Sequence, residues 1–287
     1  MQLFHSLREL RTFLAGRGEQ RVGFVPTMGN LHAGHCQLVT LAKQHADIVV
    51  VSIFVNPLQF GANEDFGSYP RTLQADCDKL QAVGADVVFA PTVAEMYPDF
   101  DGQSLHQQVV IQPPPLADDL CGASRPGHFA GVATVVAKLF HMVQPQVAVF
   151  GKKDYQQLMV IRALVRQLNF EIEIIAGETA REPSGLAMSS RNGYLTEAEK
   201  IQAAQLNQLL QRIQQALLSG RRDYAALREQ ACLMLKQQGW QVDYVEIRRQ
   251  QSLTLPDAQT RDWVILAAAR LGKTRLIDNC EVSASGD

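Results

Sequence analysis

The sequence predicts an α/β protein, with a Rossmann-like, doubly wound parallel sheet followed by a smaller C-terminal α+β domain. Five short runs rich in Val and Ile barely alternate with polar residues, which is typical of strands buried on both faces of a sheet. Helical patterns lie between these runs at the spacing of βαβ units. After about residue 178 the composition changes to a polar, turn-rich connection and then to Gln- and Leu-rich helices.

The first part of the chain holds the elements of the parallel sheet. The strands are predicted over residues 22–25, 47–55, 85–90, 146–150 and 171–175. The helices are predicted over residues 34–45, 72–83 and 152–169. The second of these helices stops at Gly84, a residue that often ends helices. We therefore expect one domain that spans residues 1–178.

The second part of the chain begins with a helix start signal. Thr196 and Glu199 form a capping-box pattern, which predicts a long helix ending near Gly220. A second helix is predicted at 224–238 and a strand at 241–249. Two further strands, separated by Gly272, are predicted to form a hairpin over residues 263–270 and 274–279. Residues 179–287 then form the smaller domain.

Composition narrows the class of protein. The chain of 287 residues carries a formal net charge of −2 and has a pI of about 6.4. It contains no basic tract of the kind that follows a nucleic-acid backbone, so we expect small-molecule partners and no nucleic acid. It shows no run of 18 apolar residues and no signal-peptide pattern, so we expect no membrane span. Five scattered cysteines without a C-x-x-C pair indicate reduced thiols in a cytoplasmic protein.

The stretch PTMGNLHAGH, residues 26–35, joins the first predicted strand to the first predicted helix. Ligands of open α/β sheets bind beyond the carboxyl ends of strands, where helix N-termini attract anions. Two glycines, Gly29 and Gly34, would let the backbone approach a phosphate, and His32 and His35 could donate hydrogen bonds to its oxygens. Spacing alone leaves a plain turn and a zinc site open as well. The zinc site is the weakest of the three, because its third candidate, Cys36, points away from the adjacent His35 on a helix.

Three more polar segments follow predicted strands or connect the two predicted domains. Asn56 and Gln59 follow the second strand and could fix a small polar ligand. Lys153 and Asp154 follow the strand at 146–150, and Lys153 could lie over phosphates. Residues 187–192, AMSSRN, supply serines and an arginine that suit phosphate binding.

Each of these segments is individually also compatible with an ordinary surface turn. Their shared position at the carboxyl edge of the sheet favours one common site. They supply hydrogen-bond donors, cations and glycines, without a Ser-His-Asp or Cys-His nucleophile set. The residues therefore indicate positioning and charge stabilisation on a phosphate.

Taken in order, several segments resemble those of one enzyme family. FVPTMGNLHAGH is followed by FVNPLQF, YPRT, RPGHF, FGKKDYQQL, GLAMSSRNGYL and LIDN. This series resembles the pantoate–β-alanine ligases (pantothenate synthetases), which belong to the HIGH-motif nucleotidyltransferases. The resemblance implies a nucleotidyltransferase-type sheet, and ATP-dependent condensation of (R)-pantoate with β-alanine to give pantothenate, AMP and pyrophosphate. It also implies a pantoyl-adenylate intermediate, Mg²⁺ bound mainly through the ATP phosphates, a homodimer, and a C-terminal lid.

The resemblance also implies roles for individual residues. The resemblance implies that His32, His35 and Lys153 are catalytic, with His35 as a proton donor. Pantoate and β-alanine would be held by Gln59, Gln157 and Asn56. The expected ATP-binding residues are Met28, Gly29, Asn30, Leu31, His32, Ala33, Gly34, His35, Gly151, Lys153, Asp154, Ala180, Met188, Ser189, Ser190 and Arg191.

Two positions depart from the family pattern. Lys152 stands where the family commonly has Glu, and we expect its side chain to point to solvent rather than to ATP. Cys121 also stands where Glu is common, and residues 121–129 are predicted to be a loop in which Arg125 and His128 have no assigned role.

Three other functions remain alternatives at this point. They are an adenylyltransferase of the same superfamily, an aminoacyl-tRNA synthetase, and a nucleotide-binding regulatory protein without catalysis.

Overall fold

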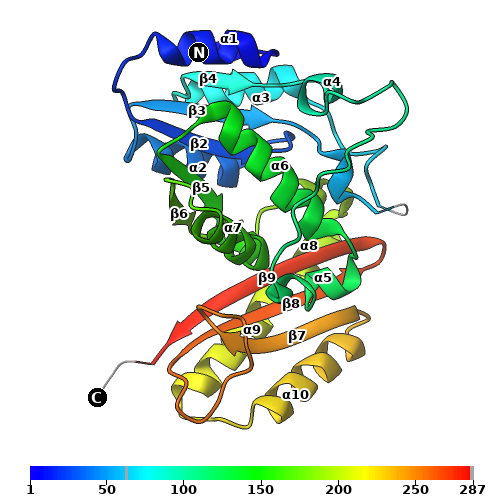
Figure 1. The fold of residues 1–287 in the computed structure, drawn as a ribbon. Helices are drawn as coiled ribbons and strands as arrows, with labels where there is room; N and C mark the ends of the chain where they lie inside the picture. The colour runs from blue at the N-terminus through cyan, green and yellow to red at the C-terminus, as the bar shows by residue number, and fades with distance from the viewer. Residues whose placement is uncertain (62–63, 285–287) are drawn as a thin grey trace.

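The computed structural model describes residues 1–61 and 64–284, which contain two β-sheets (Figure 1). The larger sheet has six strands in the order β1-β4-β3-β2-β5-β6, and all neighbouring strands in it are parallel. The smaller sheet has the order β7-β8-β9 and is antiparallel. The predicted α/β fold with a smaller C-terminal sheet domain is confirmed.

The elements up to the end of the larger sheet are β1 (Gln2–Phe4), α1 (Leu7–Ala15), β2 (Val22–Thr27), α2 (Ala33–Lys43), β3 (Ile48–Ile53), η1 (Pro57–Gln59), α3 (Leu73–Ala82), β4 (Val87–Phe89), α4 (Val93–Met96), η2 (Pro115–Ala117), α5 (Cys121–Ser124), α6 (His128–Val143), β5 (Val147–Gly151), η3 (Lys152–Asp154), α7 (Tyr155–Gln167) and β6 (Glu173–Gly177). The remaining elements are η4 (Ser190–Tyr194), α8 (Glu197–Ala203), α9 (Gln205–Leu218), α10 (Tyr224–Gln237), β7 (Gln241–Arg249), β8 (Asp262–Leu271) and β9 (Thr274–Ser283).

Helices cover both faces of the larger sheet. On one face, α1, α6 and α7 pack against strand residues such as Phe24 and Val50. On the other face, α2 and α3 pack against residues such as Val25 and Val49. Because successive strand residues are buried on opposite faces, the central strands read as continuous apolar runs, as the sequence predicted.

The strand order reverses between β2 and β5. From β2 the sheet grows through β3 to β4 on one side, and from β5 to β6 on the other. Helix α2 follows β2, and η3 with α7 follows β5, so both helical N-termini lie at the same edge of the sheet. This reversal is the position where open α/β sheets bind their ligands.

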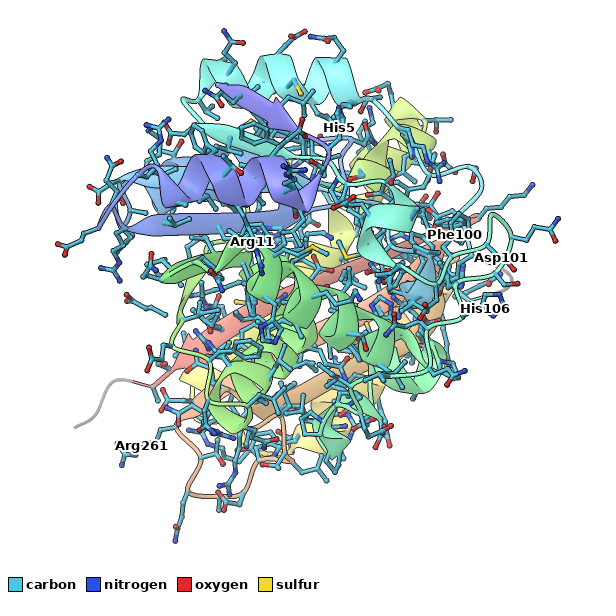
Figure 2. The ribbon with its side chains drawn as sticks, turned by 45° about the horizontal axis from the view of Figure 1, so that its top comes forward. His5, Arg11, Phe100, Asp101, His106 and Arg261 are labelled. Atoms are coloured by element: carbon cyan, nitrogen blue, oxygen red, sulfur yellow. The ribbon has the colours of Figure 1, made fainter. Side chains whose placement is uncertain are left out.

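The first 15 residues contain two elements that the sequence did not predict. Strand β1 has only three residues and pairs with β4 at the edge of the sheet. The ring Nδ1 of His5 lies 2.7 Å from the carbonyl oxygen of Ala90, and Arg11 on α1 donates to the carbonyl oxygen of His141 on α6 at 2.8 Å (Figure 2). These long-range contacts hold a segment that is too short to show a strand pattern.

The loop predicted over residues 121–129 is wrong, because helices α5 and α6 occupy most of this range. Helix α6 begins at His128, and residues 121–124 form the short helix α5. Most of α6 is buried, because it lies between the larger sheet and α1 and α7. A helix that is apolar on nearly all sides lacks the 3.6-residue contrast that reveals surface helices.

The predicted single helix ending near Gly220 is also corrected. It is divided into α8 and α9 at Ala204, which keeps right-handed helical angles of φ −62° and ψ −19°. The hydrogen bonds from Ala204 N to Lys200 O and from Gln208 N to Ala204 O are both 3.3 Å long, so the division is a local loosening of the helix. The predicted capping box of Thr196 and Glu199 is confirmed at the start of α8.

The smaller sheet lies between two layers. One of its faces packs on α9 and α10 through residues such as Trp263 and Ile265. The other face, through Val264 and Leu266 of β8, packs on Tyr155 and Met159 of α7. We call helices α8–α10 with strands β7–β9 the C-terminal domain. Within the described ranges, no helix has the length and apolar character needed to cross a membrane.

Candidate active site

Helix α3 fixes the loop between β2 and α2. The loop places Gly29 and Asn30 in the left-handed region, with φ of 82° and 50°. The carboxylate of Asp76, which is fully buried, accepts hydrogen bonds from the backbone N–H groups of Asn30 and Leu31, each at 2.8 Å. Lys79, one turn further along α3, donates to the carbonyl oxygen of Leu31 at 2.7 Å. The loop conformation therefore depends on a helix that lies more than forty positions away in the sequence.

Sequence reasoning missed Asp76. The signal that could have found it is its place on α3, where Asp76, Cys77 and Leu80 form the buried face. An Asp on the apolar face of a helix needs hydrogen-bond donors, because burying an unpaired carboxylate is very costly. The loop N–H groups are those donors.

The two predicted histidines begin α2 in a reciprocal arrangement. Nδ1 of His32 accepts from the backbone N–H of Gly34 at 3.1 Å, and Nδ1 of His35 accepts from the backbone N–H of His32 at 3.2 Å. Their ring centroids lie 4.1 Å apart. Because both Nδ1 atoms are acceptors, each neutral ring carries its proton on Nε2.

The environment keeps both rings uncharged at neutral pH. Burial, with smaller contributions from His35 and Lys153, lowers the pKa of His32 to about 3. Burial and Lys153 lower the pKa of His35 to about 4. Two neutral Nε2–H groups are therefore fixed at the N-terminus of α2, where the helix also favours anions.

Gly34 permits the close approach of the first histidine. A Cβ at this position would lie 2.9 Å from Cε1 of His32 and 3.1 Å from Cβ of Ala180. Real Cβ atoms do not approach ring atoms this closely. Only glycine therefore fits between the His32 ring and the segment that carries Ala180.

These side chains line a cavity of about 230 Å³ at the strand-order reversal. Four expected ATP-binding residues do not line this cavity. Leu31 points into the core, Gly29 and Asn30 face Asp76, and Ala33 is the first residue of α2. The expected residues that line it are Met28, His32, Gly34, His35, Asn56, Gln59, Gly151, Lys153, Asp154, Gln157, Ala180, Met188, Ser189, Ser190 and Arg191.

Asn56 and Gln59 form one hydrogen-bonded unit on the floor of this cavity. Nδ2 of Asn56 donates to Oε1 of Gln59 at 3.0 Å and to the carbonyl oxygen of Gly131 on α6 at 3.2 Å. Oδ1 of Asn56 accepts from the hydroxyl of Tyr97 at 2.5 Å, and burial raises the pKa of that hydroxyl. Nε2 of Gln59 lies 3.1 Å from Sδ of Met28. The amide of Gln59 is therefore oriented directly by Asn56 and Met28, and Asn56 is itself fixed by Tyr97 and Gly131.

Arg125 and His128, which the sequence left without a role, brace the same segment. Arg125 makes a two-pronged ion pair with Glu64, with both N–O distances 2.6 Å, and also lies 2.9 Å from Nε2 of His128. Nδ1 of His128 lies 2.9 Å from the carbonyl oxygen of Gln59. Burial, followed by the Arg125 charge, lowers the pKa of His128 to about 4. The ring is therefore neutral and donates Nδ1–H to the carbonyl.

The turn after β5 and the segment 178–191 close the cavity. Nζ of Lys153 lies 3.9 Å from Oδ2 of Asp154. Burial raises the pKa of Asp154, but the nearby Lys153 and Arg191 outweigh burial and hold that pKa below its ordinary value. Arg191 itself pairs with Asp65 at 3.0 Å. The site thus presents two cations beside an ionised carboxylate.

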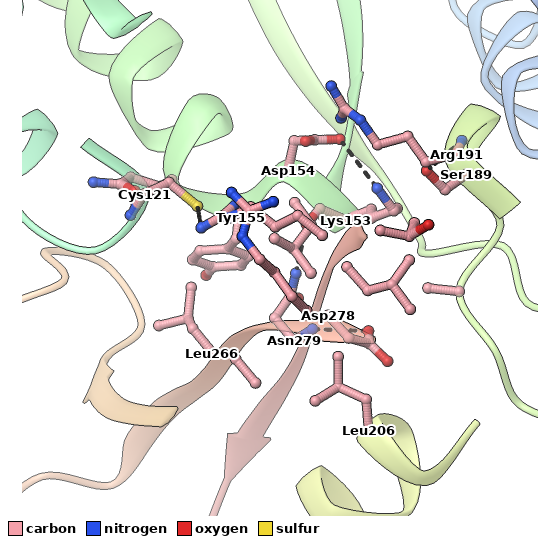
Figure 3. Close-up of a pocket in the computed structure, with 18 of the residues that line it drawn as sticks. Cys121, Lys153, Asp154, Tyr155, Ser189, Arg191, Leu206, Leu266, Asp278 and Asn279 are labelled. Carbon is pink, nitrogen blue, oxygen red and sulfur yellow. Dashed lines mark hydrogen bonds and ion pairs between the residues drawn. The ribbon is translucent and has the colours of Figure 1, made fainter. Parts of the chain in front are cut away.

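A second cavity of about 490 Å³ lies between the larger sheet and the C-terminal domain (Figure 3). Sequence reasoning missed it, because its lining joins α7 to β8 and β9 across the domain contact. Residues common to both cavities mark where they meet. These are Lys153, Asp154, Gln157, Ser189 and Arg191.

The two family departures both lie at the domain contact. Nζ of Lys152 pairs with Glu178 at 2.5 Å and Glu281 at 2.6 Å, so the expectation that it points to solvent is wrong. Sγ of Cys121 lies 3.1 Å from the hydroxyl of Tyr244 in the C-terminal domain, and all five cysteines are free thiols.

The zinc alternative has little support in the site. Within residues 1–61 and 64–284, no three His, Cys, Asp or Glu side chains are grouped as metal ligands. Both histidines already use Nδ1 as a hydrogen-bond acceptor.

Comparison with known proteins gives consistent matches. Residues 2–281 match the family model described as pantoate-beta-alanine ligase. The pantothenate synthetase of Methylobacillus flagellatus is 57% identical over 283 residues, which cover 99% of each chain. The crystal structure of pantothenate synthetase from Thermus thermophilus matches with a TM-score of 0.90 and 42% identity, covering 99% of this chain and 100% of that one. The Francisella tularensis pantoate-beta-alanine ligase, complexed with beta-gamma ATP and beta-alanine, matches with a TM-score of 0.82 and 35% identity, covering 98% and 97%.

Proposed function

The chain belongs to the pantoate–β-alanine ligase family, and on that premise we propose how its own residues carry out the reaction. The enzyme is an ATP-dependent ligase that condenses pantoate with β-alanine to form the amide of pantothenate. One observation carries the assignment of the site: His32, His35, Lys153 and Gln59 line one cavity at the strand-order reversal.

In the first half-reaction, the pantoate carboxylate attacks the α-phosphate of ATP and releases pyrophosphate. Two anions must meet, so the site has to offset their repulsion. His32 and His35 donate hydrogen bonds from Nε2–H, while Lys153 and Arg191 supply positive charge. The depressed pKa values of the two histidines support hydrogen-bond donation by neutral rings rather than proton transfer from His35.

Pantoate lies between the amides and α6. Gln59 and Gln157 hold its polar groups, and Asn56 orients Gln59. The cavity wall formed by Val132, Val135, Val136 and Leu139 of α6, with Phe54, suits the two methyl groups of pantoate.

The proposed Mg²⁺ fits the residues present. Mg²⁺ is usually held by phosphates with one or two carboxylates, and Asp154 is an ionised carboxylate where the two cavities meet. When bound by ATP and Asp154, the ion would neutralise phosphate charge.

In the second half-reaction, the amine of β-alanine attacks the acyl carbon of pantoyl adenylate and AMP leaves. An acyl adenylate is hydrolysed easily, so water has to be excluded. We divide the chain at residues 178/179 and assign the C-terminal domain the role of a lid. The interdomain cavity and the Arg248–Asp119 ion pair of 2.8 Å support this role.

We also propose a cytoplasmic homodimer. Val109 and Val110, in the extended segment between α4 and η2, are 80% and 53% exposed. A partner subunit would cover such apolar side chains. Light scattering after gel filtration tests the assembly, and a monomer at micromolar concentration would contradict it.

Pyrophosphate–ATP isotope exchange tests the mechanism. With pantoate present and β-alanine absent, the adenylate forms and reverts, so labelled pyrophosphate should enter ATP. Without pantoate the exchange should stop. Folded enzyme that makes pantothenate but shows no pantoate-dependent exchange would exclude the pantoyl-adenylate route.

A further inference from the structure

Strand β9 of the C-terminal domain contacts both segments that carry the proposed ATP-binding cations. Its residues Asp278 and Asn279 line the interdomain cavity together with Lys153 and Arg191 (Figure 3). Neither Asp278 nor Asn279 has a role in the reaction described above. Both are nevertheless buried, with exposures of 4% and 6%, and the side chains of both form hydrogen bonds with groups outside β9.

Asn279 holds the turn that carries the proposed catalytic lysine. Its Nδ2 group donates one hydrogen bond to the carbonyl oxygen of Lys152 and one to the carbonyl oxygen of Lys153, each at 2.9 Å. An amide nitrogen has two hydrogens, so both are used on this turn. Glu281, two residues along β9, pairs with Nζ of Lys152 at 2.6 Å and accepts from the hydroxyl of Tyr155 at 2.8 Å.

Asp278 holds the second segment. Its carboxylate makes two hydrogen bonds with the guanidinium of Arg181, at 2.8 and 2.9 Å. Arg181 also donates to the carbonyl oxygen of Gly185 at 3.0 Å and forms a β-bridge with Ala187. This pair therefore fixes the base of the segment that continues to Arg191.

The Lys153 side chain has little else to fix it. Its ion pair with Asp154 is 3.9 Å long, which is beyond hydrogen-bond distance. The position of Nζ is therefore set mainly by the backbone turn from which the side chain extends. A shift of that turn moves the charge away from the phosphates.

We propose that Asn279 is a positioning residue for Lys153, and that β9 makes the placement of Lys153 depend on the docking of the C-terminal domain. The inference rests on the proposed function of Lys153. Docking of the C-terminal domain would then not only cover the site but also put Lys153 in place, because separation of β9 from the larger sheet releases the Lys153 turn. The coupling acts on the adenylation step and leaves unchanged the part of the proposed pantoate pocket that η1 and α6 build.

A double-mutant cycle tests this proposal in the full-length enzyme. The variants are Asn279→Ala, Lys153→Ala and the combination of both, assayed by pantoate-dependent pyrophosphate–ATP exchange. Asn279→Ala should lower the maximal exchange rate by roughly 10- to 100-fold, the loss expected for a displacement of about 1 Å, with KM for pantoate changed less than about threefold. In the Lys153→Ala background the same change should cost less than about threefold, because its target is gone.

Two controls separate positioning from loss of folding. Thr260→Ala removes a hydrogen bond to Asp257 elsewhere in the C-terminal domain and should leave exchange unchanged. If Asn279→Ala does not fold, Asn279→Asp replaces it in the cycle. It has the same size but presents carboxylate oxygen to two carbonyl oxygens, so it should be at least as slow as the alanine variant.

The outcomes of the cycle are distinct. If Lys153→Ala exchanges at the wild-type rate, the proposed role of Lys153 fails, and the inference fails with it. If Lys153→Ala is slow but the Asn279 change has no effect, or costs the same in both backgrounds, the positioning role of Asn279 is wrong while the proposed function stands.

Discussion

Replacing Gly131 with alanine should damage the proposed pantoate pocket without changing any of the side chains that line it. Gly131 lies on α6 where this helix meets η1. A Cβ there would lie 2.3 Å from the carbonyl oxygen of Leu58 and 2.8 Å from the backbone nitrogen of Gln59. Both neighbours are backbone atoms, so no side-chain rotation relieves the overlap.

The size of the effect follows from these distances. Ordinary van der Waals contact begins at about 3.4 Å, so α6 and η1 must separate by about 1 Å. That movement stretches the 3.2 Å hydrogen bond from Asn56 to the Gly131 carbonyl and displaces Gln59. A misplacement of about 1 Å can cost roughly 100-fold in rate, or about 2.7 kcal/mol of transition-state stabilisation.

Stability should change less than activity in Gly131→Ala. Overpacking costs about 1–3 kcal/mol, and alanine recovers about 1 kcal/mol of helix propensity relative to glycine. The folded fraction at 25 °C should therefore remain high, and the kinetic loss can be measured on native enzyme. Urea unfolding followed by circular dichroism provides this check.

The assay is pantoate-dependent pyrophosphate–ATP exchange at varied pantoate and varied ATP. We expect kcat/KM for pantoate to fall roughly 100-fold, while KM for ATP changes less than about threefold. Gly67→Ala is the matched control, because its new Cβ meets nothing within 4 Å. A folded Gly131→Ala enzyme with normal kcat/KM for pantoate would refute the positioning of Gln59 by α6.

Three further perturbations test other parts of the structure. His35→Ala should lower kcat by about 10²- to 10³-fold, as the loss of one fixed hydrogen-bond donor does in other enzymes. Steady-state turnover at the wild-type rate would refute the proposed catalytic role of His35. Asp76→Asn removes the negative charge that faces two loop N–H groups and replaces one acceptor oxygen with an NH₂ group. It should therefore lower the free energy of unfolding by about 1–3 kcal/mol and slow turnover. An unchanged urea midpoint would contradict this expectation. The folded pKa of His128, about 4, lies below its ordinary value of 6.5, so its contribution to stability is present above pH 6.5 and is lost as pH falls towards 4. Urea midpoints should therefore fall across this window, and less steeply in His128→Gln; parallel profiles would show that His128 does not contribute.

The sequence predicted the parts of the site that depend on local order. His32 and His35 stand directly after a buried strand, and so do Lys153 and Asp154. Because parallel strands end at one edge of a sheet, strand prediction was enough to bring these segments together. The structure places them on one cavity.

The supporting residues were not predictable in the same way. Asp76, Tyr97 and Asn279 act on segments 41 to 126 positions away in the chain. Their patterns in the sequence are those of an ordinary helix, loop and strand. Helix α6 was missed because it is apolar on most sides. Contacts between such distant segments are set by tertiary packing, and the local periodicity of apolar residues in the sequence carries no information about them.

The strand-order reversal also has a consequence for folding kinetics. Strands β2, β3 and β4 are joined by single crossover connections, whereas β2 and β5 pair through residues far apart in the chain, Gly23 with Val147 and Phe24 with Ala148. The backbone N–H of Val22 donates to Gln146 across 124 positions of the chain. Pairing of such distant segments is slow because a long loop must close first. The histidine loop follows β2 and the Lys153 turn follows β5, so the two halves of the proposed nucleotide site come together only when these two strands pair. During refolding, the capacity to bind ATP should appear after most of the helix signal has returned.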